Sequence, residues 1–208
     1  MKIFTEIKKN RGMTYVELIV VLTIFSTLSS VVVFNYVAFQ DKIDVKNLTS
    51  DIALKVVEAQ KSSVSGRLPP SPQQSGVTSS WRASYGLHFN LSDNKRFQFF
   101  TDVNQDGLYN SSDCPGNASN EECLDEVSIA KGGSISGLSV LCQGDDSTKN
   151  LQDLMITFVR PSGSAILKSS STEIDCMSGI AYVGISVISP RDFTATVRIF
   201  PSGRIELK

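Results

Sequence analysis

Residues 102–113 read DVNQDGLYNSSD, a run of oxygen-bearing side chains with the spacing of a calcium-binding loop. The oxygens at the expected ligand positions come from carboxylates, one amide and one main-chain carbonyl: Asp102, Asn104, Asp106, the Leu108 carbonyl and Asp113. Gly107 permits the sharp turn that such a loop needs. Hard oxygen ligands suit calcium better than zinc. The pattern therefore predicts a calcium site, with a polar hairpin loop held by Asx turns as the alternative.

The cysteines form an even set in the C-terminal part of the chain: Cys114, Cys123, Cys142 and Cys176. No Cys-x-x-Cys spacing occurs, so a zinc or redox site is not indicated. Two disulfides in an oxidising compartment are expected instead. Of the three pairings that four cysteines allow, we favour Cys114–Cys123, which closes a short local loop beside residues 102–113, together with Cys142–Cys176.

Little else in the sequence has the character of a catalytic group. There is one histidine, His88, and neither a nucleophile elbow nor a phosphate-binding loop. His88 falls on the polar side of an alternating segment and is interpreted as a solvated strand residue. The acidic run formed by Glu121, Glu122, Asp125 and Glu126 is interpreted as a solvated face. We therefore expect a protein that is not an enzyme.

Charge is distributed unevenly along the 208 residues. The formal net charge is −1, yet residues 1–12 carry four basic residues and one acidic residue. The rest of the chain has 16 basic and 20 acidic residues, a charge of −4. A mildly acidic domain lacks the basic footprint of a general nucleic-acid-binding protein.

A junction near the N-terminus separates this basic leader from an apolar stretch. Residues 18–34 contain no charged residue, and Glu17 lies immediately before them. A carboxylate in hydrocarbon costs about 3 kcal/mol on insertion scales, so one at this place is expected to have a function. The apolar run is about long enough to span a bilayer. A secretory signal is the first alternative, but the apolar run is longer than a typical signal core and no small-x-small cleavage site follows it cleanly. A plain membrane anchor is the second, and it explains the length but not Gly12 or Glu17.

The segment RGMTYVELIVVLTIFSTLSSVVV, residues 11–33, resembles the class III signal of type IV pilins and type II secretion pseudopilins. The resemblance implies cleavage after Gly12 by a prepilin peptidase and N-methylation of Met13. It also implies that Glu17, then the fifth residue, neutralises the N-terminal amine of a neighbouring subunit in a filament. Met13 replaces the usual Phe, and Phe34 stands where many major pilins have proline, which disfavours a major pilin.

The helix is expected to continue past the apolar run as an amphipathic segment. Apolar residues recur every three or four positions on one stripe: Val45, Leu48, Ile52, Val56 and Ala59. The helix should end near residues 62–66, before a Pro-rich stretch. The expected organisation is a prepilin leader (1–12), a transmembrane helix half (13–39), an amphipathic helix half (40–65), a Pro/Ser linker (66–80) and a β-rich globular head (81–208).

The head reads as a set of short strands. Apolar residues alternate perfectly along 81–91, the period of a half-buried strand. Further strands are expected at 97–100, 126–130, 138–142, 154–159 and 180–189. Two segments, ITFVRPSGSAIL and VRIFPSGRIEL, read as hairpins around Pro-Ser-Gly turns. This ending resembles the GspH/FimT type of minor pilin, which implies an α+β pilin fold: a long helix packed on a small antiparallel β-sheet head.

The leading functional hypothesis is a structural subunit, a minor pilin or pseudopilin of a type IV pilus or a type II protein-secretion filament. Its expected partners are other pilin subunits, the prepilin peptidase and the bacterial inner membrane, which it would cross once with the head in the periplasm or outside. A second hypothesis is a DNA-binding minor pilin for natural transformation, with contacts from Arg191, Arg198 and Arg204. A third is a membrane-anchored binding module outside any filament.

Overall fold

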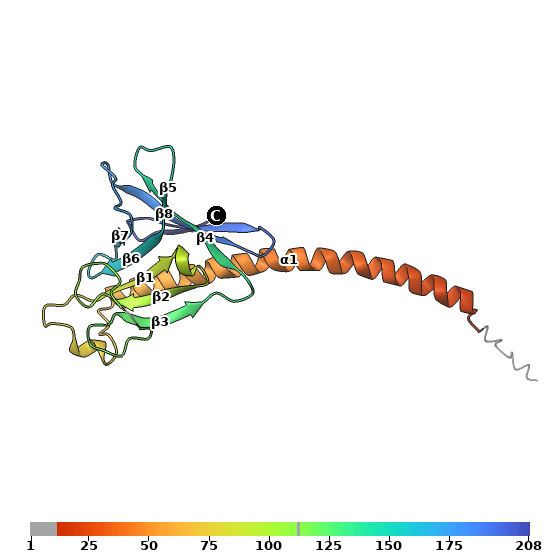
Figure 1. Ribbon diagram of the computed structural model, residues 1–208, viewed down its shortest axis with the longest axis horizontal. Helices are drawn as coiled ribbons and strands as arrows, with labels where there is room; N and C mark the ends of the chain where they lie inside the picture. Colours follow the sequence, from red (N-terminus) through yellow and green to blue (C-terminus); the bar gives the residue numbers. More distant parts are fainter. Residues whose placement is uncertain (1–11, 112) are drawn as a thin grey trace, which may run out of the picture. The chain divides into compact units, whose positions relative to one another are not determined.

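The protein is an α+β molecule with an N-terminal apolar helix and two antiparallel sheets (Figure 1). The structure is a computed structural model that describes residues 12–111 and 113–208, apart from the side chains of residues 34, 35, 37 and 38. The chain divides into two units, residues 1–40 and 41–208. Helix α1, Tyr15–Val64, contributes residues to both units. Each unit is described separately below.

In the first unit, α1 begins with a side-chain cap. The backbone N–H of Glu17 donates to Thr14 Oγ1 at 3.3 Å, so Thr14 satisfies one of the free donors at the helix start. The hydroxyls of Thr23 and Thr27 donate to main-chain carbonyls one turn back, at 2.8 and 2.9 Å. These polar groups are therefore satisfied inside the helix, as an apolar surrounding requires.

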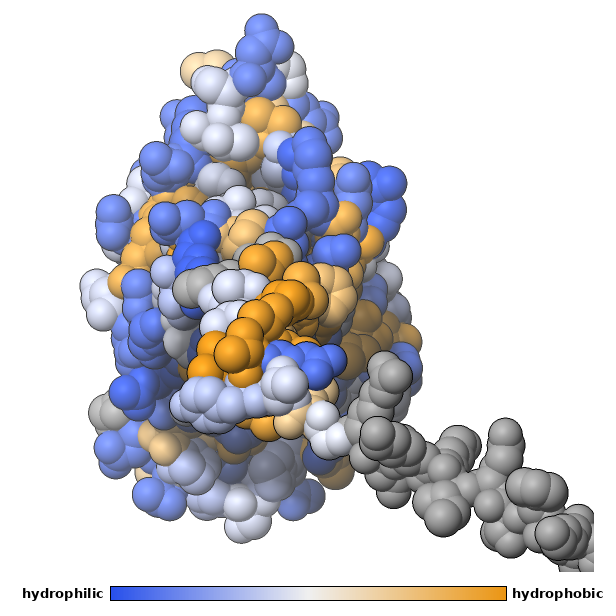
Figure 2. Space-filling view, turned by 90° about the vertical axis from the view of Figure 1, so that its right-hand side faces the viewer, coloured by the Kyte–Doolittle hydropathy of each residue, from blue (hydrophilic) through white to orange (hydrophobic). Residues whose placement is uncertain are grey.

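The side chains of this part of α1 are apolar and exposed. Large hydrophobic residues are exposed all along it: Tyr15, Val16, Leu18, Ile19, Val20, Val21, Leu22, Ile24, Phe25, Leu28, Val31, Val32 and Val33. The apolar side chains of this segment contribute to the orange surface that faces the viewer in Figure 2. The segment Tyr15–Val33 has a mean hydropathy of 2.3 and is long and apolar enough to cross a membrane, a test that a signal sequence near an N-terminus also passes.

The second unit contains both sheets, and the neighbouring strands are all antiparallel. The first sheet has the order β3 (Cys123–Ser128), β2 (Arg96–Thr101), β1 (Ser84–Asn90), β6 (Asp153–Val159) and β7 (Ala165–Lys168). The second has the order β10 (Ile205–Leu207), β9 (Thr194–Ile199), β8 (Ile180–Ile188), β4 (Ser134–Cys142) and β5 (Lys149–Leu151).

The core of this unit lies between the C-terminal half of α1 and the two sheets. The predicted apolar stripe is confirmed, since Val45, Ile52, Val56 and Ala59 are buried and Leu48 packs against them. The alternation along β1 is confirmed as well, with Tyr85, Leu87 and Phe89 fully buried in the same cluster: one side of the strand faces the core. A buried hydroxyl ties the helix to the first sheet. Ser63 Oγ donates to the Phe158 carbonyl at 2.7 Å and accepts from the Tyr85 N–H at 3.1 Å.

The predicted secondary structure agrees with the observed one except at short or polar segments. Strand β1 is shorter than the alternating run at 81–91, and β3 begins three residues before the predicted start at 126. Strand β5 was not predicted, because Lys149 and Asn150 are polar and exposed. The 66–80 segment, expected as a Pro/Ser linker, has some local structure. It contains the 3-10 turn η1 (Gln73–Ser75), and buried Gln73 donates to the Gly116 carbonyl at 3.0 Å.

Both Pro-Ser-Gly segments form hairpins, as predicted, and the two turns meet. One joins β6 to β7 and the other joins β9 to β10, so they belong to different sheets. Gln60 of α1 donates from Nε2 to the Gly163 carbonyl at 2.9 Å, and the Ala165 N–H donates to the Pro201 carbonyl at 2.9 Å. A Cβ at Gly203 would lie 2.3 Å from Gln60 Nε2. We call this three-way junction of Gln60 with the two turns the turn contact.

Two disulfides are present, as predicted, and they follow the favoured pairing. Cys114–Cys123 joins the segment after the polar loop to the start of β3, and Cys142–Cys176 joins the end of β4 to the segment before β8. The first closes a loop of nine residues in sequence separation and the second a loop of 34. The first braces the irregular segment before β3, whereas the loop closed by the second contains β5, β6 and β7.

Candidate functional site

The N-terminal junction lies at the exposed start of α1. Gly12 and Met13 precede the helix, and the Met13 side chain is exposed. Glu17 is also exposed, in the first turn, where a carboxylate interacts favourably with the helix dipole. It is the single charged residue between Met13 and Phe39. Residues 1–11 of the expected leader lie outside the described residues.

Thr14 and Glu17 have the spacing of a capping box, Thr-x-x-Glu. The Thr14 half of that motif is present, because its hydroxyl accepts from the Glu17 N–H. A capping role alone would be filled by Gln as well as by Glu. The charge of Glu17 is therefore separable from its capping function, which makes the two roles testable by substitution.

The polar loop is built around one buried carboxylate. Asp102 is 1% exposed, and its Oδ2 accepts from Ser84 Oγ at 3.2 Å and from the Gly107 N–H at 3.0 Å. Its Oδ1 is buried and has no hydrogen-bond partner. Burial is the largest influence on this group and raises the pKa of Asp102, and the nearby charge of Asp106 raises it further.

The other predicted ligands form Asx turns in the same loop. Asn104 Oδ1 accepts from the Asp106 N–H at 3.0 Å, and Asp106 Oδ1 accepts from the Leu108 N–H at 2.7 Å. Asp106 Oδ2 accepts from the amides of Asn104 and Asn110 at 2.9 and 2.8 Å. Positive φ angles at Gln105 (63°) and Gly107 (73°) tighten the turn. The loop therefore has the hydrogen bonds of the Asx-turn alternative, and these bonds leave lone pairs on several of its oxygens.

Asp113, the last predicted ligand, is exposed, and its main-chain carbonyl accepts from Ser111 Oγ at 2.7 Å. Across residues 12–111 and 113–208, no three His, Cys, Asp or Glu side chains are grouped so that they could hold a metal ion. Hydrogen bonds within the loop connect Asn104, Asp106 and Leu108, and Asp102 reaches the same turn through the Gly107 N–H.

Glu122 is a residue of this loop that the sequence did not reveal. Its Oε1 accepts from the Val103 N–H at 3.0 Å and its Oε2 from the Asn110 N–H at 2.7 Å, so it clamps both ends of the loop. It is 1% exposed, so the interpretation of the acidic run as a solvated face is wrong for Glu122. Burial raises the pKa of Glu122 to about 7. The sequence contained one signal for this role. Glu122 is next to Cys123, and the predicted disulfide from Cys123 to Cys114 places Glu122 near the loop.

The three arginines considered for DNA contact do not form one cluster. Arg191 lies in the β8–β9 turn, with Nε 3.5 Å from Asp41 Oδ2, an ion pair without a hydrogen bond. Arg198 and Arg204 lie toward the other end of β9, where they stack on Tyr182 and Phe200 at 4.6 and 3.8 Å from the ring centroids. Arg204 is also 3.9 Å from Glu206. The positive charge of the three arginines is thus divided between the two ends of β9. Asp41 and Glu206 partly neutralise it.

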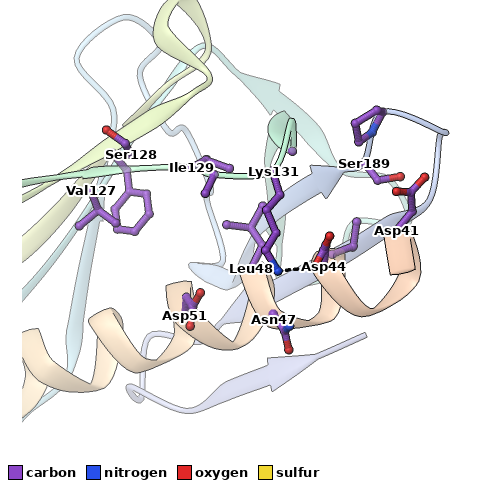
Figure 3. Close-up of a pocket in the computed structure, with 15 residues that line it drawn as sticks. Asp41, Asp44, Asn47, Leu48, Asp51, Val127, Ser128, Ile129, Lys131 and Ser189 are labelled. Atoms are coloured by element: carbon purple, nitrogen blue, oxygen red, sulfur yellow. Dashed lines mark hydrogen bonds and ion pairs between the residues drawn. The ribbon is translucent and has the colours of Figure 1, made fainter. Parts of the chain in front are cut away.

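A cavity of about 160 Å³ lies between α1 and the connection from β3 to β4 (Figure 3). Asp41, Asp44 and Asp51 line it from the helix, and Val127, Ile129 and Lys131 line it from the opposite side. Lys131 Nζ is 2.7 Å from Asp44 Oδ1, and Asp41 faces Arg191. Its acidic side is thus partly neutralised by cations of the same unit, and nothing in it has the arrangement of a catalytic group.

His88 is half-buried rather than fully solvated. Its Nδ1 is 3.1 Å from Gln98 Oε1, and its ring stacks on Tyr109 with centroids 4.7 Å apart. Burial lowers the pKa of His88, with the Gln98 hydrogen bond acting in the opposite direction. These contacts give the side chain a packing role between β1 and the polar loop.

No family model, curated protein or solved structure matches this chain.

Proposed function

We propose that this protein is a minor pilin or pseudopilin, a structural subunit of a type IV pilus or a type II secretion filament. The observation that carries the proposal is the exposed apolar segment Tyr15–Val33 with a single carboxylate in its first turn, directly after Gly12-Met13. An exposed hydrophobic surface of this extent needs lipid or other apolar helices as partners. A bacterial inner membrane and sister subunits would supply both.

The compact structure of the head, residues 41–208, supports the same proposal. Residues 41–208 form one compact unit with its own core, two disulfides and the turn contact. A compact head of this kind suits a subunit that assembles with its neighbours and displays its loops. In the proposed maturation, the chain inserts in the membrane, the prepilin peptidase removes residues 1–12, and Met13 is methylated. The mature subunit then enters a filament.

The test is the N-terminus of the mature chain. The full chain is produced in a bacterium with and without its prepilin peptidase, and the N-terminal peptide is analysed by mass spectrometry. We expect the chain to begin at N-methyl-Met13 only where the peptidase is present. Gly12→Leu should abolish this product, whereas Lys2→Gln, a change in the same leader away from the cut, should retain it. A chain that keeps residues 1–12, or is cut elsewhere in both hosts, contradicts the proposal.

A further inference from the structure

The carboxylate of Asp102 carries an oxygen that the protein leaves unused. Asp102 is 1% exposed, its Oδ2 is held by Ser84 and Gly107, and its Oδ1 has no partner. A buried acceptor without a donor is unfavourable, because burial removes its hydrogen bonds to water and no protein donor replaces them. Because Gly107 is on the far side of the turn from Asp102, the bond at Oδ2 holds the carboxylate inside the loop.

The surroundings of this oxygen are negative. The charges of Asp106 and Asp102 both raise the pKa of Glu122, although burial is its largest cause. The one cationic side chain that contacts the loop's main chain among the described hydrogen bonds is Lys168, whose ammonium donates to the Asp106 carbonyl. This ammonium therefore bonds to a main-chain oxygen. The carboxylates of Asp102 and Asp106 accept their hydrogen bonds from neutral donors.

The remaining ligand positions have oxygens with free lone pairs. A carboxylate offers about four acceptor sites, and Asp106 uses three of them in hydrogen bonds to Leu108, Asn104 and Asn110. Asn104 Oδ1 accepts one hydrogen bond and can accept a second interaction. An oxygen that receives an N–H in an Asx turn can thus also bind a cation.

We propose that residues 102–108 bind a calcium ion, with Asp102 Oδ1 as the anchoring ligand and with Asn104, Asp106 and the Leu108 carbonyl completing the protein's share. Asp113 is outside this set, and Glu122 holds the loop closed instead of coordinating. Oxygen ligands of mixed charge favour calcium over magnesium, which demands a near-ideal octahedron. With two carboxylates, the affinity should be that of extracellular calcium modules, with a Kd of about 0.1–1 mM.

The chain contains its own reporter for this site. Trp81 is the only tryptophan, and its Nε1 donates to the Asp102 main-chain carbonyl at 2.9 Å. The full chain is purified in detergent, treated with a chelator and titrated with calcium while Trp81 emission and the melting temperature are followed. We expect a saturable change with half-saturation at about 0.1–1 mM and a rise in Tm, and a much weaker response to magnesium. An unchanged emission and Tm up to about 10 mM calcium, well beyond that range, overturns the proposal.

Two neighbouring aspartates provide matched variants. Asp106→Asn changes an exposed ligand, so the variant should fold, and we expect its calcium affinity to fall about tenfold or more because one ligand charge is lost. Asp113→Asn makes the same chemical change seven residues further on and should bind like wild type. Equal affinity in wild type and Asp106→Asn, or an equal loss in both variants, overturns the proposed ligand set. Because the titration needs neither processing nor assembly, it is independent of the proposed function.

Discussion

Asp153 organises a loop through a single side chain. It is 3% exposed and accepts hydrogen bonds from the backbone N–H groups of Ser170 and Ser171 at 2.8 and 3.0 Å. The hydroxyls of Ser169, Ser170 and Ser171 donate to it as well. Burial alone raises the pKa of a carboxyl, but here the serine hydrogen bonds outweigh it and hold the pKa of Asp153 well below its usual range.

Asp153→Asn should lower the free energy of unfolding by about 2–3 kcal/mol near pH 7, because charge-assisted hydrogen bonds are lost. The folded-state pKa is depressed, so the ionised group stabilises the fold above its unfolded pKa and the benefit is lost as pH falls further below it. The wild type should therefore lose stability below about pH 4 more steeply than the variant. Urea unfolding across this pH range measures both effects.

Exposed Asp146→Asn is the control for Asp153, and it should leave the unfolding free energy within about 0.5 kcal/mol of wild type. Equal stability of the Asp153→Asn variant and wild type at neutral pH would contradict the role given to the serine loop. No sequence pattern identifies Asp153 as a buried hydrogen-bond centre, and the one sequence signal for Glu122 is its place beside Cys123. Their partners come from segments 12 to 19 residues away, and no local pattern marks such contacts.

At the scale of elements, the turn contact depends on glycine at position 203. The residue has φ +83°, and an added Cβ would lie 2.3 Å from Gln60 Nε2 and 2.7 Å from the Gly163 carbonyl oxygen. Gly203→Ala therefore combines backbone strain with a clash against another turn's main chain. We expect a loss of about 2–4 kcal/mol in the free energy of unfolding, measured by urea denaturation.

Gly144→Ala separates the two causes. Gly144 has φ +89°, but nothing lies within 4 Å of an added Cβ, so this variant should show the backbone strain alone, about 1–2 kcal/mol. If Gly203→Ala lowered the free energy of unfolding no more than Gly144→Ala, the close approach of the two turns would contribute nothing to stability.

The elements with a clear period were the ones that the sequence predicted well. The stripe from Val45 to Ala59 and the alternation from Ala83 to Phe89 follow directly from the geometry of a helix and a strand, and both face the core. The hairpins followed from Pro-Ser-Gly chemistry. Their meeting at Gln60 was not predictable, because a turn's local sequence contains no information about which distant turn it contacts. The polar loop was found by its ligand spacing, but that spacing does not show which of its carboxylates is buried, which in the fold is Asp102.

At the scale of the whole molecule, the proposed filament would supply Glu17 with an oppositely charged partner. In an apolar interior, the carboxylate and the Met13 amine of a neighbour stabilise each other, and breaking such a buried pair costs about 3–5 kcal/mol. Glu17→Gln keeps a side chain suited to the capping box but removes the charge. We expect normal processing and a large loss of incorporation into sheared filaments, measured by immunoblotting of the filament and membrane fractions.

Thr14→Val is the matched control for this prediction, since it removes the capping oxygen and retains the carboxylate. It should be incorporated far better than Glu17→Gln. Equal incorporation of Glu17→Gln and wild type would show that the charge pair is dispensable, without bearing on whether residues 1–12 are removed.

The turn contact also sets an order of events during synthesis. Gln60 and Gly203 are separated by 143 positions, and translation at about 5–20 residues per second leaves roughly 7 to 29 s between their synthesis. The head cannot close during that interval, because the strands that cover the helix stripe follow it in the chain. The apolar segment Tyr15–Val33 is complete long before then. Membrane capture can therefore precede folding of the head, and a nascent chain held at the bilayer keeps its uncovered stripe away from other unfolded chains.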